Sequence, residues 1–257
     1  MPRLGGARVL DLFAGSGDDI LFGRGAYDEI RAGGGNDIIA GGTDGDSLNG
    51  GVGNDVYLFN PGDGSGGYIY DDYTLTGENT DTLSLGGGIR PEDIDAYVEY
   101  GRGYADLMLR IRSTGEKIWT AWTEQDYLGY DEFLTTLDHR IEQIQFLGNG
   151  DDRIFDLKGL VDSRYQDLKD AWDYGTPILL FTPEALQSFD ITGQVPFTGD
   201  QYAINYATTG DVYPPVTDNN IPVVVNPVPA ANGELYNFLH FQVSPDTFSD
   251  PDSGDTL

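Results

Sequence analysis

Residues 14–58 read AGSGDDILF GRGAYDEIR AGGGNDIIA GGTDGDSLN GGVGNDVYL when the chain is divided into units of nine. Each unit follows the nonapeptide pattern G-G-x-G-x-D-x-U-x, in which U is an apolar residue. The sixth position is always aspartate and the eighth always apolar: Asp19, Asp28, Asp37, Asp46 and Asp55, followed by Leu21, Ile30, Ile39, Leu48 and Tyr57. Glycine and aspartate favour a turn in the first six residues, and the last three suit a short strand whose central side chain points inward. The pattern therefore predicts a repeated turn and strand.

Two such units complete one coil, so residues eighteen apart stack at about the 4.8 Å spacing of neighbouring strands. This spacing divides the aspartates into two rows, which we call the odd edge (Asp19, Asp37 and Asp55) and the even edge (Asp28 and Asp46). Carboxylates stacked in this way repel one another unless a cation lies between them. Calcium takes roughly six to eight oxygen ligands, and carboxylates and the carbonyls of glycine-rich turns supply only oxygen. The sequence therefore predicts Ca²⁺ as the cofactor.

The two edges differ in their glycines. The odd-numbered units keep glycine at their second and fourth positions: Gly15, Gly17, Gly33, Gly35, Gly51 and Gly53. The even-numbered units carry Arg24, Ala26 and Asp44 at equivalent positions. We therefore predict two metal sites on the odd edge, one between each pair of neighbouring aspartates, and a weaker or empty site on the even edge. A flexible linker rich in glycine and aspartate, without metal, is the alternative interpretation.

The repeats resemble the haemolysin-type (RTX) calcium-binding repeats of proteins exported by type I secretion. Residues 53–64 (GNDVYLFNPGDG) look like the closing turn of such an array. The domain that often follows the repeats, the haemolysin-type calcium-binding-related domain, is similar to three further stretches: residues 81–94 (DTLSLGGGIRPEDI), 106–122 (DLMLRIRSTGEKIWTAW) and 141–150 (IEQIQFLGNG). Residues 65–68 interrupt the family pattern, which disfavours Asp63 and Asp71 as ligands. The resemblance implies an extracellular protein, secreted through a type I system with an uncleaved C-terminal signal.

Composition narrows the class of protein. The 257 residues include 14 basic and 43 acidic side chains, and the formal net charge of -29 argues against nucleic acid and anionic membranes and for divalent cations. The 36 glycines and 12% aromatic residues indicate β structure with many turns. Cysteine is absent, which excludes disulfides and thiolate metal sites. No run approaches the roughly 18 apolar residues of a transmembrane segment, and Met1 to Gly6 cannot serve as a Sec signal peptide.

We expect a mainly β chain with five parts, and the sequence indicates their limits. They are a parallel β-roll (1–65), the β-rich haemolysin-type calcium-binding-related domain (66–160), a mixed region with a short helix (161–212), a Pro-rich linker (213–233) and the start of a cadherin-like domain (234–257). The last part resembles the opening strands of a dystroglycan-type cadherin-like domain, an incomplete Ig-like module. At the other end, residues 5–13 keep an inward Leu12 but place Leu10 at the aspartate position, which is typical of a degenerate N-terminal cap.

Enzymatic interpretations are disfavoured by the sequence. Residues 8–17 (RVLDLFAGSG) resemble the first motif of SAM-dependent methyltransferases, but the glycines that follow disfavour the helix that this fold needs. The GDSL sequence at residues 45–48 lacks a histidine partner in a D-x-x-H context. We therefore expect no catalytic residues and no enzyme.

The expected function is calcium binding by repeats that fold on export. The chain would be a fragment of a secreted protein, a multidomain adhesin or surface protein whose other domains bind cell-surface or matrix ligands. A calcium-binding accessory module of a secreted hydrolase or toxin is the alternative. In both cases the acidic repeats would stay disordered at the low calcium concentration of the cytosol and become ordered outside the cell.

Overall fold

The computed structural model describes residues 9–71, 79–100, 105–121, 141–148, 150–164, 166–168, 170, 178–212, 223–224 and 248–249. Contacts divide the chain into two compact units, residues 1–212 and 213–257. The described part of the second unit is an antiparallel pair of short strands, β15 (Val223–Val224) and β16 (Phe248–Ser249). The expected linker and cadherin-like start therefore lie almost wholly outside the described residues.

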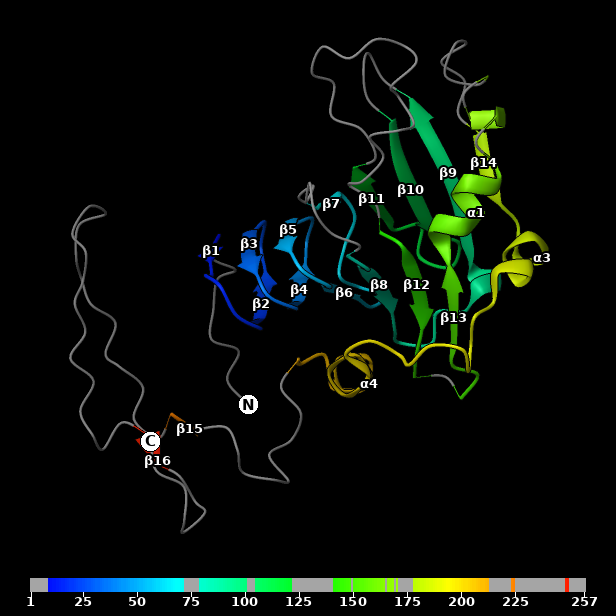
Figure 1. Ribbon diagram of the computed structural model, residues 1–257. Coiled ribbons are helices and arrows are strands. Elements are labelled where there is room, and N and C mark those ends of the chain that lie inside the picture. Colours follow the sequence, from blue (N-terminus) through cyan, green and yellow to red (C-terminus); the bar gives the residue numbers. More distant parts are fainter. Residues whose placement is uncertain are drawn as a thin grey trace. The chain divides into compact units, whose positions relative to one another are not determined.

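The first unit is mainly β and contains two mixed sheets (Figure 1). The eight-stranded sheet has the order β1-β3-β5-β7-β11-β10-β9-β14. Its strands are β1 (Asp11–Phe13), β3 (Glu29–Gly34), β5 (Ser47–Val52), β7 (Gly67–Tyr70), β9 (Ile94–Tyr100), β10 (Ala105–Ile111), β11 (Lys117–Ala121) and β14 (Ile178–Phe181). The six-stranded sheet has the order β13-β12-β8-β6-β4-β2. Its strands are β2 (Ile20–Gly25), β4 (Ile38–Thr43), β6 (Val56–Phe59), β8 (Thr82–Leu85), β12 (Gln143–Phe146) and β13 (Arg153–Asp156).

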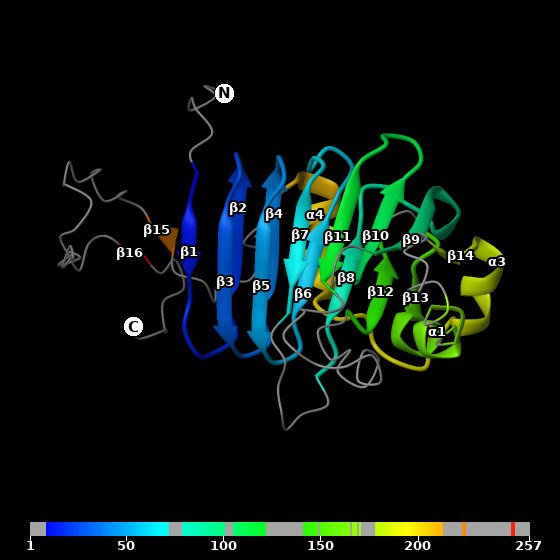
Figure 2. The ribbon, with the colours of Figure 1, turned by 90° about the horizontal axis from the view of Figure 1, so that it is seen from above.

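Successive strands of the repeat region alternate between the two sheets and pair in parallel with the strand two further along. Ile30 pairs with Leu48 in the first sheet and Ile20 with Ile38 in the second, which is the eighteen-residue register expected from the nonapeptide. Figure 2 shows these strands side by side in two layers. After the repeats the parallel stack continues with longer connections, because Val56 pairs with Thr82. The repeats and the strands that follow them are therefore hydrogen-bonded into the same sheets.

The main core lies between the two sheets. The inward side chains Ile30, Ile39 and Tyr57 are fully buried there, together with Leu83 of β8 and Leu107 of β10. Because these residues come from both sheets, one apolar layer joins the repeat region to the strands that follow it. Burial of such side chains is worth roughly 1.5–3 kcal/mol each, which is the main force that holds the sheets together.

Short helices cover the remaining apolar surfaces. They are α1 (Leu157–Ser163), α3 (Pro183–Leu186), α4 (Asp200–Thr209) and the 3₁₀ turns η1 (Pro91–Asp93) and η2 (Gln187–Phe189). The Asp156 carboxylate caps α1 by accepting a hydrogen bond from the Gly159 N–H (2.7 Å). Helix α4 covers the outer face of the second sheet, where Ala203 and Tyr206 pack against a separate apolar cluster that includes Val56.

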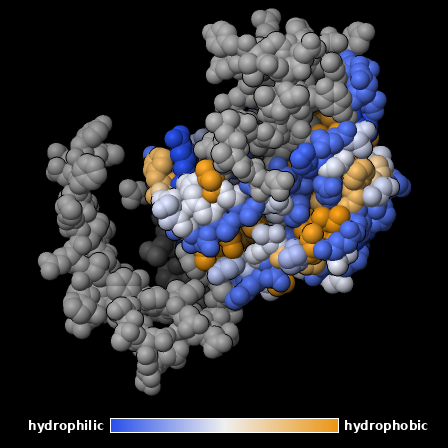
Figure 3. Space-filling view, viewed as in Figure 1, coloured by the Kyte–Doolittle hydropathy of each residue, from blue (hydrophilic) through white to orange (hydrophobic). Residues whose placement is uncertain are grey.

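The described surface that faces the viewer in Figure 3 is mixed in polarity. Figure 3 shows hydrophilic areas in blue that are interrupted by small apolar areas in orange. Among the described residues, no helix is both long enough and apolar enough to cross a membrane.

Candidate metal-binding site

The aspartates of the odd edge form a ladder of hydrogen bonds between side chains and backbone. The N–H of Asp19 donates to Asp37 Oδ1 (2.8 Å), and the N–H of Asp37 donates to Asp55 Oδ1 (2.8 Å). The ladder then continues to a residue outside the repeats, because the N–H of Asp55 donates to Asp81 Oδ1 (2.8 Å). Asp37, Asp55 and Asp81 are fully buried and Asp19 is half-buried. The structure thus brings the predicted odd-edge residues together and adds Asp81.

The even edge forms the same ladder with fewer carboxylates. The N–H of Asp28 donates to Asp46 Oδ1 (2.9 Å), and the N–H of Leu10 donates to Asp28 Oδ1 (2.6 Å). Leu10 stands at the aspartate position of the degenerate first unit, so it supplies a donor to the ladder but no carboxylate. Both aspartates of this edge are buried.

In these aspartates the hydrogen bonds of the ladder use Oδ1, and the other carboxylate oxygen, Oδ2, is the candidate metal ligand. Oδ2 of Asp28, Asp37 and Asp55 is buried and has no hydrogen-bond partner among the described residues. A buried oxygen of this kind is unfavourable unless a donor or a cation compensates it. In the fifth unit, glycine at the first position makes room for the carboxylate, since a Cβ on Gly50 would overlap Asp55 Oδ2.

Four of the six odd-edge glycines are required by close contacts between the coils. At each coil, a Cβ on the glycine would overlap the carbonyl oxygen of the glycine eighteen residues earlier: Gly33 above Gly15, Gly35 above Gly17, Gly51 above Gly33 and Gly53 above Gly35. The φ angles of Gly33, Gly35, Gly51 and Gly53 also lie in the left-handed region. These glycines let the coils approach closely, so that a carbonyl oxygen of one coil lies beside the glycine of the next.

The even edge adopts the same backbone shape with side chains in place of glycine. Arg24, Ala26 and Asp44 have φ angles of 83°, 80° and 83°. A side chain in this region costs roughly 1–2 kcal/mol. The side chains that replace glycine on the even edge therefore strain its backbone.

A second ladder on the odd edge was missed by the sequence reasoning. It runs in the opposite direction: the N–H of Asn36 donates to Asp18 Oδ1 (2.7 Å), and the N–H of Asn54 donates to Asn36 Oδ1 (2.9 Å). The available signal was an aspartate or asparagine at the fifth position of every odd unit, where the even units have Tyr27 and Gly45.

Burial raises the pKa values of Asp28, Asp37, Asp46 and Asp55. It raises the pKa of Asp55 to about 7, with the Asp81 and Asp37 carboxylates adding to the effect and the Asp37 N–H opposing it. The pKa of Asp46 is raised to about 7 in the same way, and the pKa values of Asp28 and Asp37 also lie above their usual value. Desolvation and mutual repulsion both disfavour the charged forms, and a bound cation would reverse both effects.

Beyond the repeats, three buried carboxylates come together. Oxygen atoms of Asp55, Asp71 and Asp81, which we call the terminal triad, lie within 4.8 Å of one another. The interrupted family pattern disfavours Asp71 as a ligand, yet the structure places it in this cluster. Asp81 does have a signal in the sequence, because Asp81 and Leu83 repeat the D-x-U spacing outside the nine-residue register.

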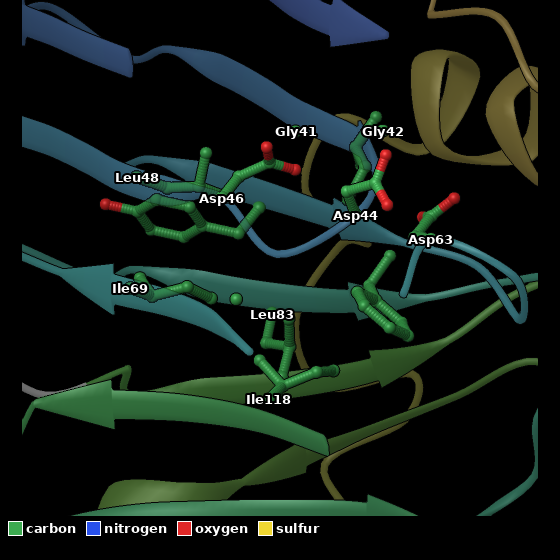
Figure 4. A pocket seen from close by; sticks show the side chains of 13 residues that line it. Gly41, Gly42, Asp44, Asp46, Leu48, Asp63, Ile69, Leu83 and Ile118 are labelled. Carbon is green, nitrogen blue, oxygen red and sulfur yellow. The ribbon is translucent and has the colours of Figure 1, made fainter. Parts of the chain in front are cut away.

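A pocket lies at the even edge, between the sheets (Figure 4). Leu48, Ile69, Leu83 and Ile118 form its apolar part, and the carboxylates of Asp44, Asp46 and Asp63 gather at its other side. Asp63 Oδ2 already accepts hydrogen bonds from the Asn60 N–H (2.6 Å) and the Tyr206 hydroxyl (2.8 Å). These contacts give Asp63 a structural role in holding α4.

The residues that resemble enzyme motifs lie in or beside strands of the two sheets. Residues 20–25, after the GSG turn, form strand β2, where a methyltransferase has a helix. Ser47 of the GDSL sequence begins strand β5, and both histidines, His139 and His240, lie outside the described residues. No family model matches the chain, and no curated protein matches it either.

Proposed function

We propose that the repeat region is a parallel β-roll of the haemolysin-type (RTX) class that binds calcium along its edges. The observation that carries this proposal is a set of buried Oδ2 atoms that have no hydrogen-bond partner among the described residues. They belong to Asp37 and Asp55, eighteen residues apart on the odd edge, and to Asp28 on the even edge. The donor set is entirely oxygen, which suits a hard cation such as Ca²⁺ and excludes the nitrogen and sulfur ligands typical of zinc.

The chain's own residues have distinct roles in this proposal. The Asp19 N–H holds Asp37 Oδ1 and so fixes the orientation of the carboxylate, which leaves Oδ2 to face the metal. Carbonyl oxygens of Gly15, Gly17 and their equivalents complete the odd-edge sites. Calcium, when bound, supplies the positive charge that these buried carboxylates lack. The even edge binds more weakly, because part of its binding energy is offset by strain at Arg24, Ala26 and Asp44.

Coupling of binding to folding follows from the same geometry. Without calcium the stacked carboxylates repel one another, and with calcium each ion joins two coils. At cytosolic calcium the repeats would stay disordered and competent for export, and outside the cell they would fold. We propose that the chain belongs to a secreted, type I-exported protein, such as a multidomain adhesin or surface protein. An accessory module of a secreted hydrolase or toxin is the second form of the proposal.

A calcium titration of the metal-free chain tests this function. Far-UV circular dichroism should gain β signal with calcium but not with magnesium. Asp37→Asn keeps the Oδ1 acceptor for Asp19 and removes only the charge, so it should weaken the calcium response at least about 10-fold. Asp28→Asn is the matched even-edge variant and should have a smaller effect. A metal-free chain that is already folded and does not respond to calcium would contradict the proposal.

A further inference from the structure

The terminal triad lies where the repeats end. Asp55 directly precedes β6, Asp81 directly precedes β8, and Asp71 directly follows β7, so both sheets contribute. All three side chains are at most 3% exposed. Three buried carboxylates in one place repel strongly unless protons or a cation neutralise them.

An independent feature points to a ligand at this position. Asp55 Oδ2 is buried and has no hydrogen-bond partner among the described residues. A Cβ on Gly50 would overlap both Asp55 Oδ2 and the Tyr57 hydroxyl, so these two oxygens lie together above Gly50. The Tyr57 hydroxyl is in turn 3.4 Å from Asp71 Oδ1 and accepts the Gly50 N–H (2.7 Å). The unsatisfied oxygen therefore faces the triad.

We propose that Asp55, Asp71 and Asp81 form a further calcium site, distinct in composition from the repeat sites. Two oxygens on opposite sides of a calcium ion are about 4.6–5.2 Å apart, given Ca–O distances of roughly 2.3–2.6 Å. Oxygens that all lie within 4.8 Å of one another can therefore share one ion. The donor set contains no histidine or cysteine, which disfavours zinc.

Asn79 provides a further oxygen for this site. Its Nδ2 donates to Asp81 Oδ2 (3.0 Å) and Asp71 Oδ2 (3.4 Å), so the amide lies between two triad carboxylates. A half-turn of the amide about its Cβ–Cγ bond replaces the nitrogen with the oxygen. The same side chain can then bridge the carboxylates without metal and act as a ligand with it.

The site would connect the repeats to the strands that follow. Asp55 belongs to the last repeat unit, whereas Asp71 and Asp81 lie beyond it. The N–H of Asp81 donates to Glu142 Oε2 (2.8 Å), directly before strand β12, which pairs with β8. An ion at the triad therefore closes the end of the odd edge and orders the start of the next part of the sheet. This inference shares Asp55 and the cation with the proposed function but uses Asp71 and Asp81, which the repeat sites do not.

The test is the number of calcium ions bound by the intact chain, measured by equilibrium dialysis at saturating calcium. Asp71→Asn should lose one ion relative to the wild-type chain, because it removes a triad carboxylate that no repeat site uses. An Asp71→Asn chain that binds as many ions as the wild type, with unchanged affinities, would overturn the inference. If Asp71→Asn loses an ion and Asp37→Asn loses none, the triad site stands and the repeat function fails.

A second measurement covers the case in which a variant does not fold. Terbium replaces calcium at oxygen sites and emits when a nearby aromatic ring is excited. Terbium at the triad lies beside the Tyr57 ring, so titration of the wild-type chain should give emission that Tyr57→Phe reduces several-fold. Unchanged emission in Tyr57→Phe, at the same number of bound terbium ions, would count against a metal at this position.

Discussion

At the scale of single residues, the fourth position of the repeat gives a controlled comparison within one chain. Gly35 and Gly53 occupy it on the odd edge with φ angles of 129° and 142°, and Ala26 and Asp44 occupy it on the even edge with φ angles of 80° and 83°. The odd glycines also contact the coil beneath them, whereas the strain at Ala26 comes from its own side chain. Substitutions at this one position should therefore have opposite effects on the two edges.

Ala26→Gly should raise the free energy of unfolding by about 0.5–1 kcal/mol, because relief of the left-handed strain exceeds the added entropy of the unfolded chain. The matched change on the odd edge, Gly35→Ala, should lower it by several kcal/mol, since its Cβ would overlap the Gly17 carbonyl. Urea unfolding in saturating calcium measures both. Destabilisation by Ala26→Gly would show that strain does not distinguish the edges.

The repeat residues could be predicted from the sequence because their contacts recur at a fixed spacing. Each ladder hydrogen bond of the repeats joins residues eighteen apart, so the nonapeptide itself contains the information. Asp71 and Asp81 lie outside this register. The strand that follows Asp81 pairs with β6 through a longer connection than those within the repeats, because Val56 pairs with Thr82. Which carboxylate approaches Asp55 there depends on the fold of the connection, and no local pattern determines it.

At the scale of elements, helix α4 depends on contacts that are distant in sequence. The Tyr206 hydroxyl donates to Asp63 Oδ2, 143 residues away, and the Asn60 Nδ2 donates to the Tyr206 carbonyl (2.8 Å). The Tyr206 ring also packs edge-on against Phe22 of β2. The short helix expected from the sequence rests on apolar spacing in residues 159–173. Helix α4 was not predicted, because the contacts that place it on the second sheet have no periodic signal.

Tyr206→Phe should therefore destabilise the first unit by roughly 1–2 kcal/mol, since it removes a hydrogen bond to the half-buried Asp63 carboxylate while keeping the ring. The measurement is urea unfolding, followed by a double-mutant cycle with Asp63→Asn to isolate the coupling of the two side chains. A coupling energy near zero would mean that apolar packing alone holds α4 in place.

At the scale of the whole molecule, the net charge opposes folding unless it is neutralised. With a formal net charge of -29, an excess of negative charge must be brought together on folding, and part of it is buried in the two edges and the terminal triad. Protons can neutralise these buried carboxylates, and under the proposed function calcium neutralises the same groups. They should therefore substitute for each other in promoting the folded state.

Acid should thus partly replace calcium. In the unfolded chain Asp46 and Asp55 lose their protons near pH 3.8, whereas in the folded chain burial holds both pKa values at about 7. Between these values the folded state binds more protons than the unfolded state, so its stability falls as the pH rises. The metal-free chain should therefore gain β signal as the pH is lowered from about 8 to 5, by a free energy on the order of a few kcal/mol. With saturating calcium the carboxylates are already neutralised, and the gain should largely disappear. Circular dichroism of both forms across this range measures the difference, and a metal-free chain whose β signal increases with pH would contradict the argument.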